Sequence, residues 1–200
     1  MLLYNILLTF LLSSFDPSPP EAPAVLNLKY ILLHNGKQIG EVKARRVTQD
    51  NQVVFETSTK MTIKVILNQD INYNTYAMFQ NGIMVSSKSK SYFNDKLYHT
   101  CTTQWKGKSY EIVKDNNKSS LGRQITYCGG MLYFQEPAGV SLAYSELAGV
   151  DNKIGKIGEH VYTLTDAKSK KVNKYWYKGG ILDRAYINHT VLDVEVQRVN

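Results

Sequence analysis

The stretch Val53–Leu67 reads VVFETSTKMTIKVIL, and its alternation decides the fold class. In an extended chain, successive side chains point to opposite faces of a sheet. One face is mostly apolar and carries Val53, Phe55, Met61, Ile63, Val65 and Leu67. The other face carries Glu56, Ser58, Lys60, Thr62 and Lys64. The stretch is therefore a strand with one apolar face, and that face needs a cover.

Turn-forming pairs divide most of the chain into similar strands. Pairs such as Asn35-Gly36, Asn81-Gly82 and Gly179-Gly180 separate runs rich in β-branched and aromatic residues. Asn and Gly tolerate the positive φ of tight hairpin turns. We expect twelve strands, at residues 25–34, 38–48, 52–67, 70–80, 83–93, 96–105, 108–115, 120–127, 159–166, 173–178, 181–188 and 190–199.

Strands joined by short turns predict an all-β fold with little helix, built as one antiparallel meander. Because almost no helix is available, the sheet must cover its own apolar face, as a barrel or a strongly curved sheet. A straight strand over residues 52–67 would span about 50 Å. We therefore expect a bend or bulge near Thr57–Thr59, where the apolar alternation lapses.

Residues 128–158 break the strand rhythm. Gly129-Gly130, Glu136–Gly139 and Ser141–Gly149 fit neither a strand nor a tight hairpin. We expect one or two short helices in an irregular insertion that plugs or lids one end of the barrel, and long irregular insertions are often functional.

The first 24 residues predict a signal peptide and a Pro-rich leader, followed by a single domain over residues 25–200. An apolar run from Ile6 to Leu12 precedes the Pro-rich segment. No Lys or Arg precedes that run, and the Ala-x-Ala triplet at Ala22–Ala24 lies far beyond it, so the cleavage site stays open. We expect a soluble mature protein that is periplasmic or secreted.

The charge balance gives no sign of a nucleic-acid partner. The chain has 24 Lys and Arg against 17 Asp and Glu, a formal charge of +7. Lysines such as Lys43, Lys60 and Lys88 fall on outward positions among Ser and Thr, and no dense Arg cluster is present to follow phosphates.

The sequence gives little indication of a metal site or of a catalytic nucleophile. His99 and Cys101 share a strand face, but the other histidines are single, and transition-metal sites need three or four convergent ligands. We expect no metal and no cofactor. Ser145, Glu146 and His160 supply the residue types of a hydrolase, but no Gly-x-Ser-x-Gly elbow is present. A non-enzymatic protein is expected, with a hydrolase as the lesser alternative.

Cys101 and Cys128 fit either a disulfide or two buried thiols. In a simple meander one strand lies between them, which implies a separation of about 9–10 Å. That exceeds the reach of a disulfide and favours free thiols.

A set of polar residues falls on faces that otherwise point inward: Thr57, Thr59, Thr75, Ser87, Ser89, Ser91, His99 and Thr103. An unsatisfied buried hydroxyl costs about 1–3 kcal/mol, so these residues indicate hydrogen bonds, buried water or a cavity. The alternative is a register slip after Thr57, which would turn them to solvent. Both interpretations fit the sequence.

Several motifs together resemble an uncharacterised family of small exported β-proteins, a domain of unknown function common in Bacteroidetes-type Gram-negative bacteria. The resemblance covers residues 26–199 and rests on Leu33–Gly40 (LHNGKQIG), Thr103–Trp105 (TQW), Leu132–Pro137 (LYFQEP), Tyr144–Glu146 (YSE) and Tyr175–Leu182 (YWYKGGIL). It implies a curved sheet or barrel in the periplasm or at the outer membrane, leaves peripheral membrane association open, and supplies no activity.

If that family has a shared site, the matching positions are Tyr133, Glu136, Tyr144, Ser145, Glu146 and His160. Together with the one-faced strands and inward hydroxyls, they predict a non-enzymatic protein that holds an apolar or amphipathic small molecule, a lipid-derived one among the candidates. The alternative is a cell-envelope scaffold or protein-interaction module without a ligand cavity.

Overall fold

A single fourteen-stranded antiparallel sheet forms the protein in the computed structural model, which describes residues 22–64, 68–188 and 192–199. The first eight strands are β1 (Ala24–His34), β2 (Lys37–Gln49), β3 (Gln52–Lys64), β4 (Asn68–Gln80), β5 (Ile83–Phe93), β6 (Lys96–Trp105), β7 (Tyr110–Lys114) and β8 (Asn117–Leu121). The other six are β9 (Leu142–Ser145), β10 (Val150–Gly158), β11 (Val161–Thr165), β12 (Val172–Lys178), β13 (Ile181–Asn188) and β14 (Asp193–Val199). Most of the expected leader and the expected strand residues 65–67 lie outside the described ranges.

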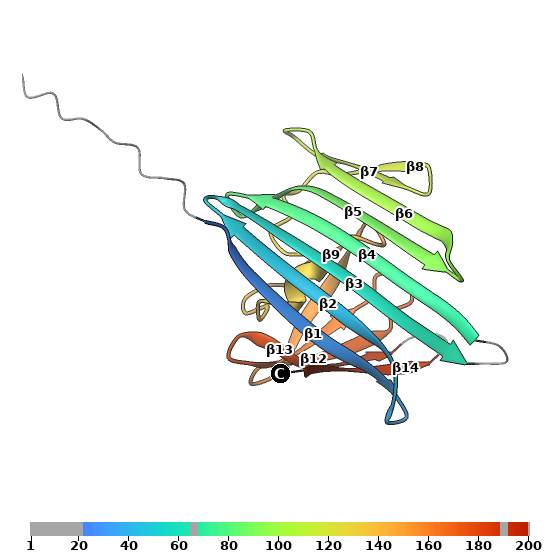
Figure 1. Ribbon diagram of the computed structural model, residues 1–200. Helices are drawn as coiled ribbons and strands as arrows, with labels where there is room; N and C mark the ends of the chain where they lie inside the picture. The colour runs from blue at the N-terminus through green and yellow to red at the C-terminus, as the bar shows by residue number, and fades with distance from the viewer. Residues whose placement is uncertain (1–21, 65–67, 189–191, 200) are drawn as a thin grey trace, which may run out of the picture.

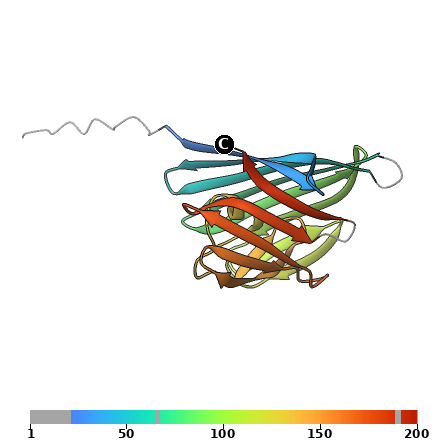
Figure 2. The ribbon, with the colours of Figure 1, turned by 90° about the horizontal axis from the view of Figure 1, so that it is seen from below.

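The sheet is a meander that curls over itself. Its order is β8-β7-β6-β5-β4-β3-β2-β1-β14-β13-β12-β11-β10-β9, so the β1–β14 pair is the one place where strands distant in the chain are neighbours. Strands β1–β6 form one layer, and the chain from β9 to β14 forms a second layer that faces it (Figures 1 and 2). The sheet is not closed, because β8 and β9 are its edges. The expected all-β curled meander is confirmed.

Most of the expected turns are confirmed by their backbone angles. Asn35 and Gly36 have φ of 49° and 73°, and Asn81 and Gly82 have φ of 52° and 77°. The turn after β7 lies at Asp115-Asn116, with φ of 48° and 68°, and so begins at the last residue of the strand expected at residues 108–115. Strand β8 therefore begins at Asn117 and ends at Leu121, and the strand expected at residues 120–127 is wrong.

The expected insertion at 128–158 is only partly irregular. It begins with a short 3₁₀ helix, η1 (Gly129–Tyr133), which confirms one helix there. The expected lack of strands in the later part of the segment is wrong, because β9 and β10 lie there. Strand β10 contains glycine, Asp and Asn, which have low strand propensity, but it pairs with β9 on one side and β11 on the other. None of the helices among the described residues has the length and apolarity to cross a bilayer.

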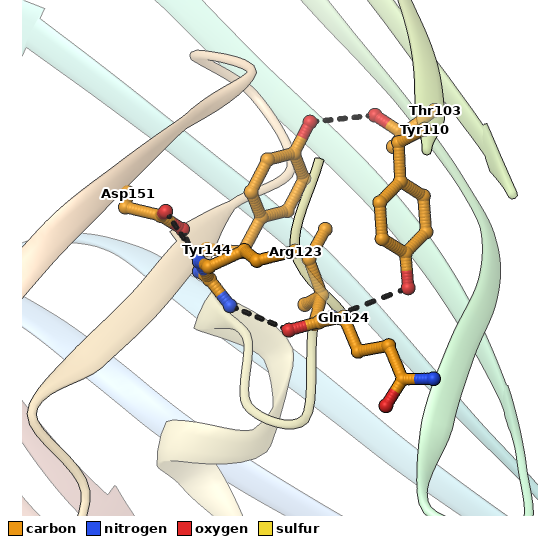
Figure 3. A network of polar contacts seen from close by, with 7 residues as sticks. Thr103, Tyr110, Arg123, Gln124, Tyr144 and Asp151 are labelled. Atoms are coloured by element: carbon orange, nitrogen blue, oxygen red, sulfur yellow. Dashed lines mark hydrogen bonds and ion pairs between the residues drawn. The ribbon is translucent and has the colours of Figure 1, made fainter. Parts of the chain in front are cut away.

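The irregular segment after β8 is anchored to the first layer (Figure 3). The Tyr110 hydroxyl on β7 donates to the Met84 carbonyl at 2.6 Å and accepts the Ile125 N–H at 3.2 Å. The Met84 N–H donates to the Ile125 carbonyl at 2.9 Å. Because Tyr110 and Ile125 are fully buried, these bonds satisfy polar groups that water cannot reach.

The same segment also reaches the second layer. The Arg123 guanidinium pairs with both carboxylate oxygens of Asp151 on β10, and the Thr103 and Tyr144 hydroxyls share a hydrogen bond of 2.6 Å between β6 and β9 (Figure 3). Side chains and irregular backbone therefore connect the two layers on the side where no strand ladder joins β8 to β9.

The bulge expected near Thr57–Thr59 is wrong. Strand β3 keeps an unbroken register with both β2 and β4 through this stretch. Register shifts occur elsewhere, for example at Met78/Phe79 and Ser91/Tyr92. The apolar alternation lapses because polar side chains occupy inward positions, and the backbone itself does not slip.

Cys101 and Cys128 are free thiols, and both are buried. Burial raises the pKa of each thiol above its ordinary value. The expectation of two buried thiols is confirmed over the disulfide.

Gly40 is required by close packing between β2 and β3. A Cβ atom there would lie 2.7 Å from Met61 Cα and would also clash with the Lys60 carbonyl. We expect Gly40→Ala to lower the free energy of unfolding by about 3 kcal/mol. The reason is that β2 and β3 lie inside the sheet, where their other neighbours, β1 and β4, prevent the two strands from separating to admit the methyl group. Urea unfolding measures this change. Gly122→Ala is the matched control, since nothing lies within 4 Å of a Cβ at Gly122; an equal loss in both variants would contradict the packing argument.

Candidate functional site

A cavity of about 430 Å³ lies between the two layers. This size is within the range of small-molecule sites in proteins. Its walls come from β1–β4 on one side and from β12–β14 on the other side. One end of the cavity is lined by η1 and β9–β11, and we call it the inner end. The apolar and small lining residues are Leu32, Val42, Met61, Ile63, Ile71, Gly129, Gly130, Leu132, Ala143, Leu147, Leu164, Leu182, Ala185, Ile187, Leu192, Val194 and Val196.

The polar part of the lining is smaller and includes most of the residues that the sequence placed in a site. It consists of Thr57, Thr59, Tyr73, Thr75, Tyr133, Tyr144, Ser145, Glu146, Asn152 and Tyr175. The 3₁₀ helix η1 contacts β3, β4, β9 and β13, so this segment lies between the layers as an internal plug.

The inward hydroxyls predicted from alternation do face the interior. Thr57, Thr59 and Thr75 line the cavity, and Ser87, Ser89, Ser91 and Thr103 are buried. The register-slip alternative is therefore wrong. His99 is the exception, because its side chain is 40% exposed and its Nδ1 lies 2.6 Å from the Asp115 carboxylate.

The hydroxyls on β3, β4 and η1 differ in how they are satisfied. Thr57 and Thr75 are cross-strand partners whose hydroxyls share a hydrogen bond of 2.5 Å. The hydroxyls of Tyr73, on β4, and Tyr133, on η1, form no hydrogen bond with any residue in the described part of the chain. Burial raises the pKa of Tyr73, and burial with the nearby Glu146 charge raises the pKa of Tyr133 to about 12. Both phenols stay protonated at neutral pH and can donate to a molecule in the cavity.

Glu146 is a buried carboxyl group at the inner end of the cavity. Its side-chain oxygens accept the N–H groups of Gly129 at 3.0 Å and Gly130 at 2.9 Å, which are the first two residues of η1. The Cys128 thiol also hydrogen-bonds to this carboxyl. Burial raises the pKa of Glu146, although these hydrogen bonds act in the opposite direction. Glu146 therefore caps the 3₁₀ helix and holds it against β9.

The approach of Glu146 to η1 depends on two glycines. A Cβ at Gly129 would lie 2.8 Å from Glu146 Oε2, and a Cβ at Gly130 would lie 3.2 Å from Oε1 and 3.3 Å from Phe55 Cβ. The Gly-Gly pair therefore admits the carboxyl group to the backbone and allows η1 to pack on β3.

Tyr144 and Ser145 line the cavity but already have partners. The Tyr144 hydroxyl bonds to Thr103, and Ser145 Oγ accepts the Ala148 N–H at 3.1 Å, which stabilises the turn after β9. These two side chains shape the wall, and the Ser145 hydroxyl still has its own O–H to donate.

Glu136 and His160 form a separate cluster outside the cavity lining. Glu136 accepts hydrogen bonds from the Tyr162 hydroxyl at 2.7 Å and from the His160 ring at 2.8 Å, while its backbone N–H donates to the Gly180 carbonyl at 2.9 Å. Burial would raise the pKa of Glu136, but the bonds from Tyr162 and His160 lower it overall. This cluster fastens the segment after η1 to β11 and to the β12–β13 turn.

The three residues considered for a hydrolase do not form a catalytic arrangement. His160 contacts Glu136 and Glu159, Glu146 binds the η1 backbone, and Ser145 binds Ala148. Within residues 22–64, 68–188 and 192–199, no three His, Cys, Asp or Glu side chains come together as a metal site.

Sequence reasoning did not place Tyr73 in the site, although it lies on the same inward face as Thr75. The alternation of β4 was enough to find it. It also missed Asn152 and Tyr175, which lie on β10 and β12, because their position depends on how the second layer folds over the first.

Glu146 and Glu136 predict opposite pH dependences of stability. The folded-state pKa of Glu146 is raised above 4.5, so its contribution is present at or below that pH and is lost as pH rises through the folded value. The folded-state pKa of Glu136 is lowered, so its contribution is present above 4.5 and is lost as pH falls. Urea unfolding of the wild type, Glu146→Gln and Glu136→Gln from about pH 3 to pH 8 measures both. Differences from the wild type that change with pH in the same direction would contradict the assignment.

Comparisons with known proteins place the fold. A family model described as "Domain of unknown function (DUF6134)" matches residues 30–199. A solved structure, the β-barrel-like protein of domain of unknown function DUF1849 from Brucella abortus, is similar with a TM-score of 0.55 and 10% sequence identity. The match covers 89% of this chain and 96% of that one, and at this identity it supports the fold alone. No curated protein sequence matches the chain.

Proposed function

Because the chain belongs to the DUF6134 family, whose description as a domain of unknown function assigns no activity, we propose a function from the cavity. The protein holds an apolar or amphipathic, lipid-like small molecule inside its curled sheet, and it acts by binding rather than by catalysis. The observation that carries this proposal is the cavity of about 430 Å³, which is walled mainly by aliphatic side chains and contains two tyrosine hydroxyls without a partner among the described residues.

The composition of the walls supports a ligand of this kind. Apolar surface in a cavity favours an apolar occupant, since transfer of about 100 Å² of such surface from water contributes about 2.5 kcal/mol. A few polar groups in an otherwise apolar pocket orient the ligand. Tyr73 and Tyr133 supply such groups.

Binding without catalysis is favoured by the state of the reactive side chains. Ser145 accepts a backbone hydrogen bond, the Cys128 thiol is buried with a raised pKa, and Glu146 is held by two backbone N–H groups. Ser145 is not paired with a general base, as a nucleophile requires, and the Glu146 carboxyl group beside the Cys128 thiol is already held by the Gly129 and Gly130 N–H groups. The apolar run near the amino terminus fits an exported protein that meets its ligand in the periplasm or outside the cell.

Filling the cavity tests the proposal. We expect Thr59→Phe to weaken binding of a neutral fluorescent probe such as Nile red by roughly tenfold, because the larger ring occupies the cavity. Fluorescence titration of protein purified without detergent measures the binding. Thr102→Phe on β6 is the matched control, since Thr102 is exposed on the outer face.

The same protein can be examined by native mass spectrometry for a molecule retained from the cell. A solid interior that binds neither the probe nor a retained molecule would overturn the proposed function. Equal probe binding by the wild type and Thr59→Phe would show that the probe binds elsewhere.

A scaffold function is a second candidate, favoured by one observation. Phe93, Leu97 and Tyr98, around the β5–β6 hairpin, are 39%, 55% and 68% exposed, which is unusual for such large side chains in one place. A partner that cross-links to the wild type in envelope extract, and not to a variant with Leu97→Ser and Tyr98→Ser, would support it. Retention of that partner by the variant would count against this surface.

A further inference from the structure

The polar and apolar groups of the cavity lie at different depths along the strands. On β3, Thr57 and Thr59 lie near mid-strand, whereas Met61 and Ile63 lie toward the strand end at Lys64. On β4, Tyr73 is the cross-strand partner of Thr59, and Ile71 is the partner of Met61. The part of the lining that β3 and β4 contribute therefore changes from polar to apolar along these strands, from mid-strand toward the end of β3 at Lys64.

The second layer contributes both polar and apolar groups to the lining. At the inner end, η1 contributes Tyr133, whose ring lies 5.2 Å from that of Tyr30. Toward the other end, β13 and the residues around the start of β14 contribute Ile187, Leu192 and Val194. Among the tyrosines of the lining, Tyr73 and Tyr133 have hydroxyls without a partner among the described residues, and Tyr175 on β12 lies close enough to Tyr133 for the two phenols to interact.

The described residues at the inner end carry no positive charge. None of the described residues that line the cavity is Lys, Arg or His, and the single ionisable acid among them is Glu146. An ionised carboxylate or phosphate placed there would lose its hydration without gaining a cation, and it would face the Glu146 carboxyl group. Such burial is strongly unfavourable.

Resting on the proposed function, we infer that the ligand is an uncharged amphiphile bound with its polar group inward: a hydroxyl or carbonyl group lies at Tyr73 and Tyr133, and an aliphatic chain extends toward Met61, Ile63 and Ile71. Long-chain alcohols and neutral esters have this chemistry, and ionised fatty acids do not. This orientation is opposite to one in which a charged head group remains in water at the opening.

Two ligands that differ only in the head group test the inference. Nile red bound to the full mature chain is displaced with decan-1-ol or with decanoate at about pH 8, where the decanoate is ionised. We expect the apparent dissociation constant of decanoate to be at least roughly tenfold higher than that of decan-1-ol. Decanoate that binds as tightly as the alcohol would overturn the inference and leave the proposed function standing. Failure of both ligands and of the probe would overturn the two together.

Removal of the hydroxyls tests the inward orientation. In Tyr73→Phe/Tyr133→Phe, decan-1-ol binding should weaken by roughly fivefold, because the alcohol loses its hydrogen-bonding partners, while the affinity for 1,6-diphenylhexatriene, a fluorescent hydrocarbon without hydrogen-bonding groups, should change by less than about twofold. Tyr76→Phe is the matched control, since Tyr76 lies on β4 but on the opposite face from Tyr73. Unchanged decan-1-ol affinity in the double variant would overturn the inward placement of the polar group.

Discussion

The pairing of β1 with β14 is the constraint on which the rest of the structure depends. Every other neighbouring pair in the sheet is consecutive in the chain and needs only a turn or a short connection, whereas this pair joins the two ends of the sequence. It makes one sheet of two meanders and allows their apolar faces to meet. Tyr30 lies at this junction, fully buried, and its hydroxyl donates to the carbonyls of Leu182 at 3.1 Å and Tyr133 at 3.3 Å.

Between the facing layers, the segment from Gly122 to Ser141 takes the place that one more strand ladder would have in a closed barrel. Its contacts are specific hydrogen bonds of buried groups, including Glu146 with the first two N–H groups of η1. Small residues on the facing strands, such as Ala77, Ser87 and Ser89, leave space for it. The cavity lies beside this segment, and its lining includes Thr59 and Tyr73 of the first layer together with residues of η1. The plug and the cavity therefore occupy the same space between the layers.

Much of the first layer could be predicted from sequence because its signals are local. Alternation within β3 and β4, and Asn-Gly pairs between strands, report side-chain direction and turn geometry directly. Strands β9 and β10 could not be found this way, since Gly155, Asp151 and Asn152 form a strand only when both neighbours supply hydrogen bonds. The residues of the site likewise fall into those that local sequence signals predict and those that they do not. The inward threonines follow from alternation, whereas the separation of Glu136 and His160 from Glu146 depends on how the second layer folds over the first.

The absence of a ladder between β8 and β9 has a geometric consequence. In a closed barrel, the strand number and the stagger together fix the diameter, so the interior can change only if the strands change. Here the two edges are joined by irregular backbone and by pairs such as Arg123 with Asp151. The bulk of that segment, which contributes Gly129, Gly130, Leu132 and Tyr133 to the cavity lining, is therefore one of the factors that set how much of the interior stays open. Substitutions confined to it can enlarge or reduce the space for a guest molecule while all fourteen strands keep their order and register.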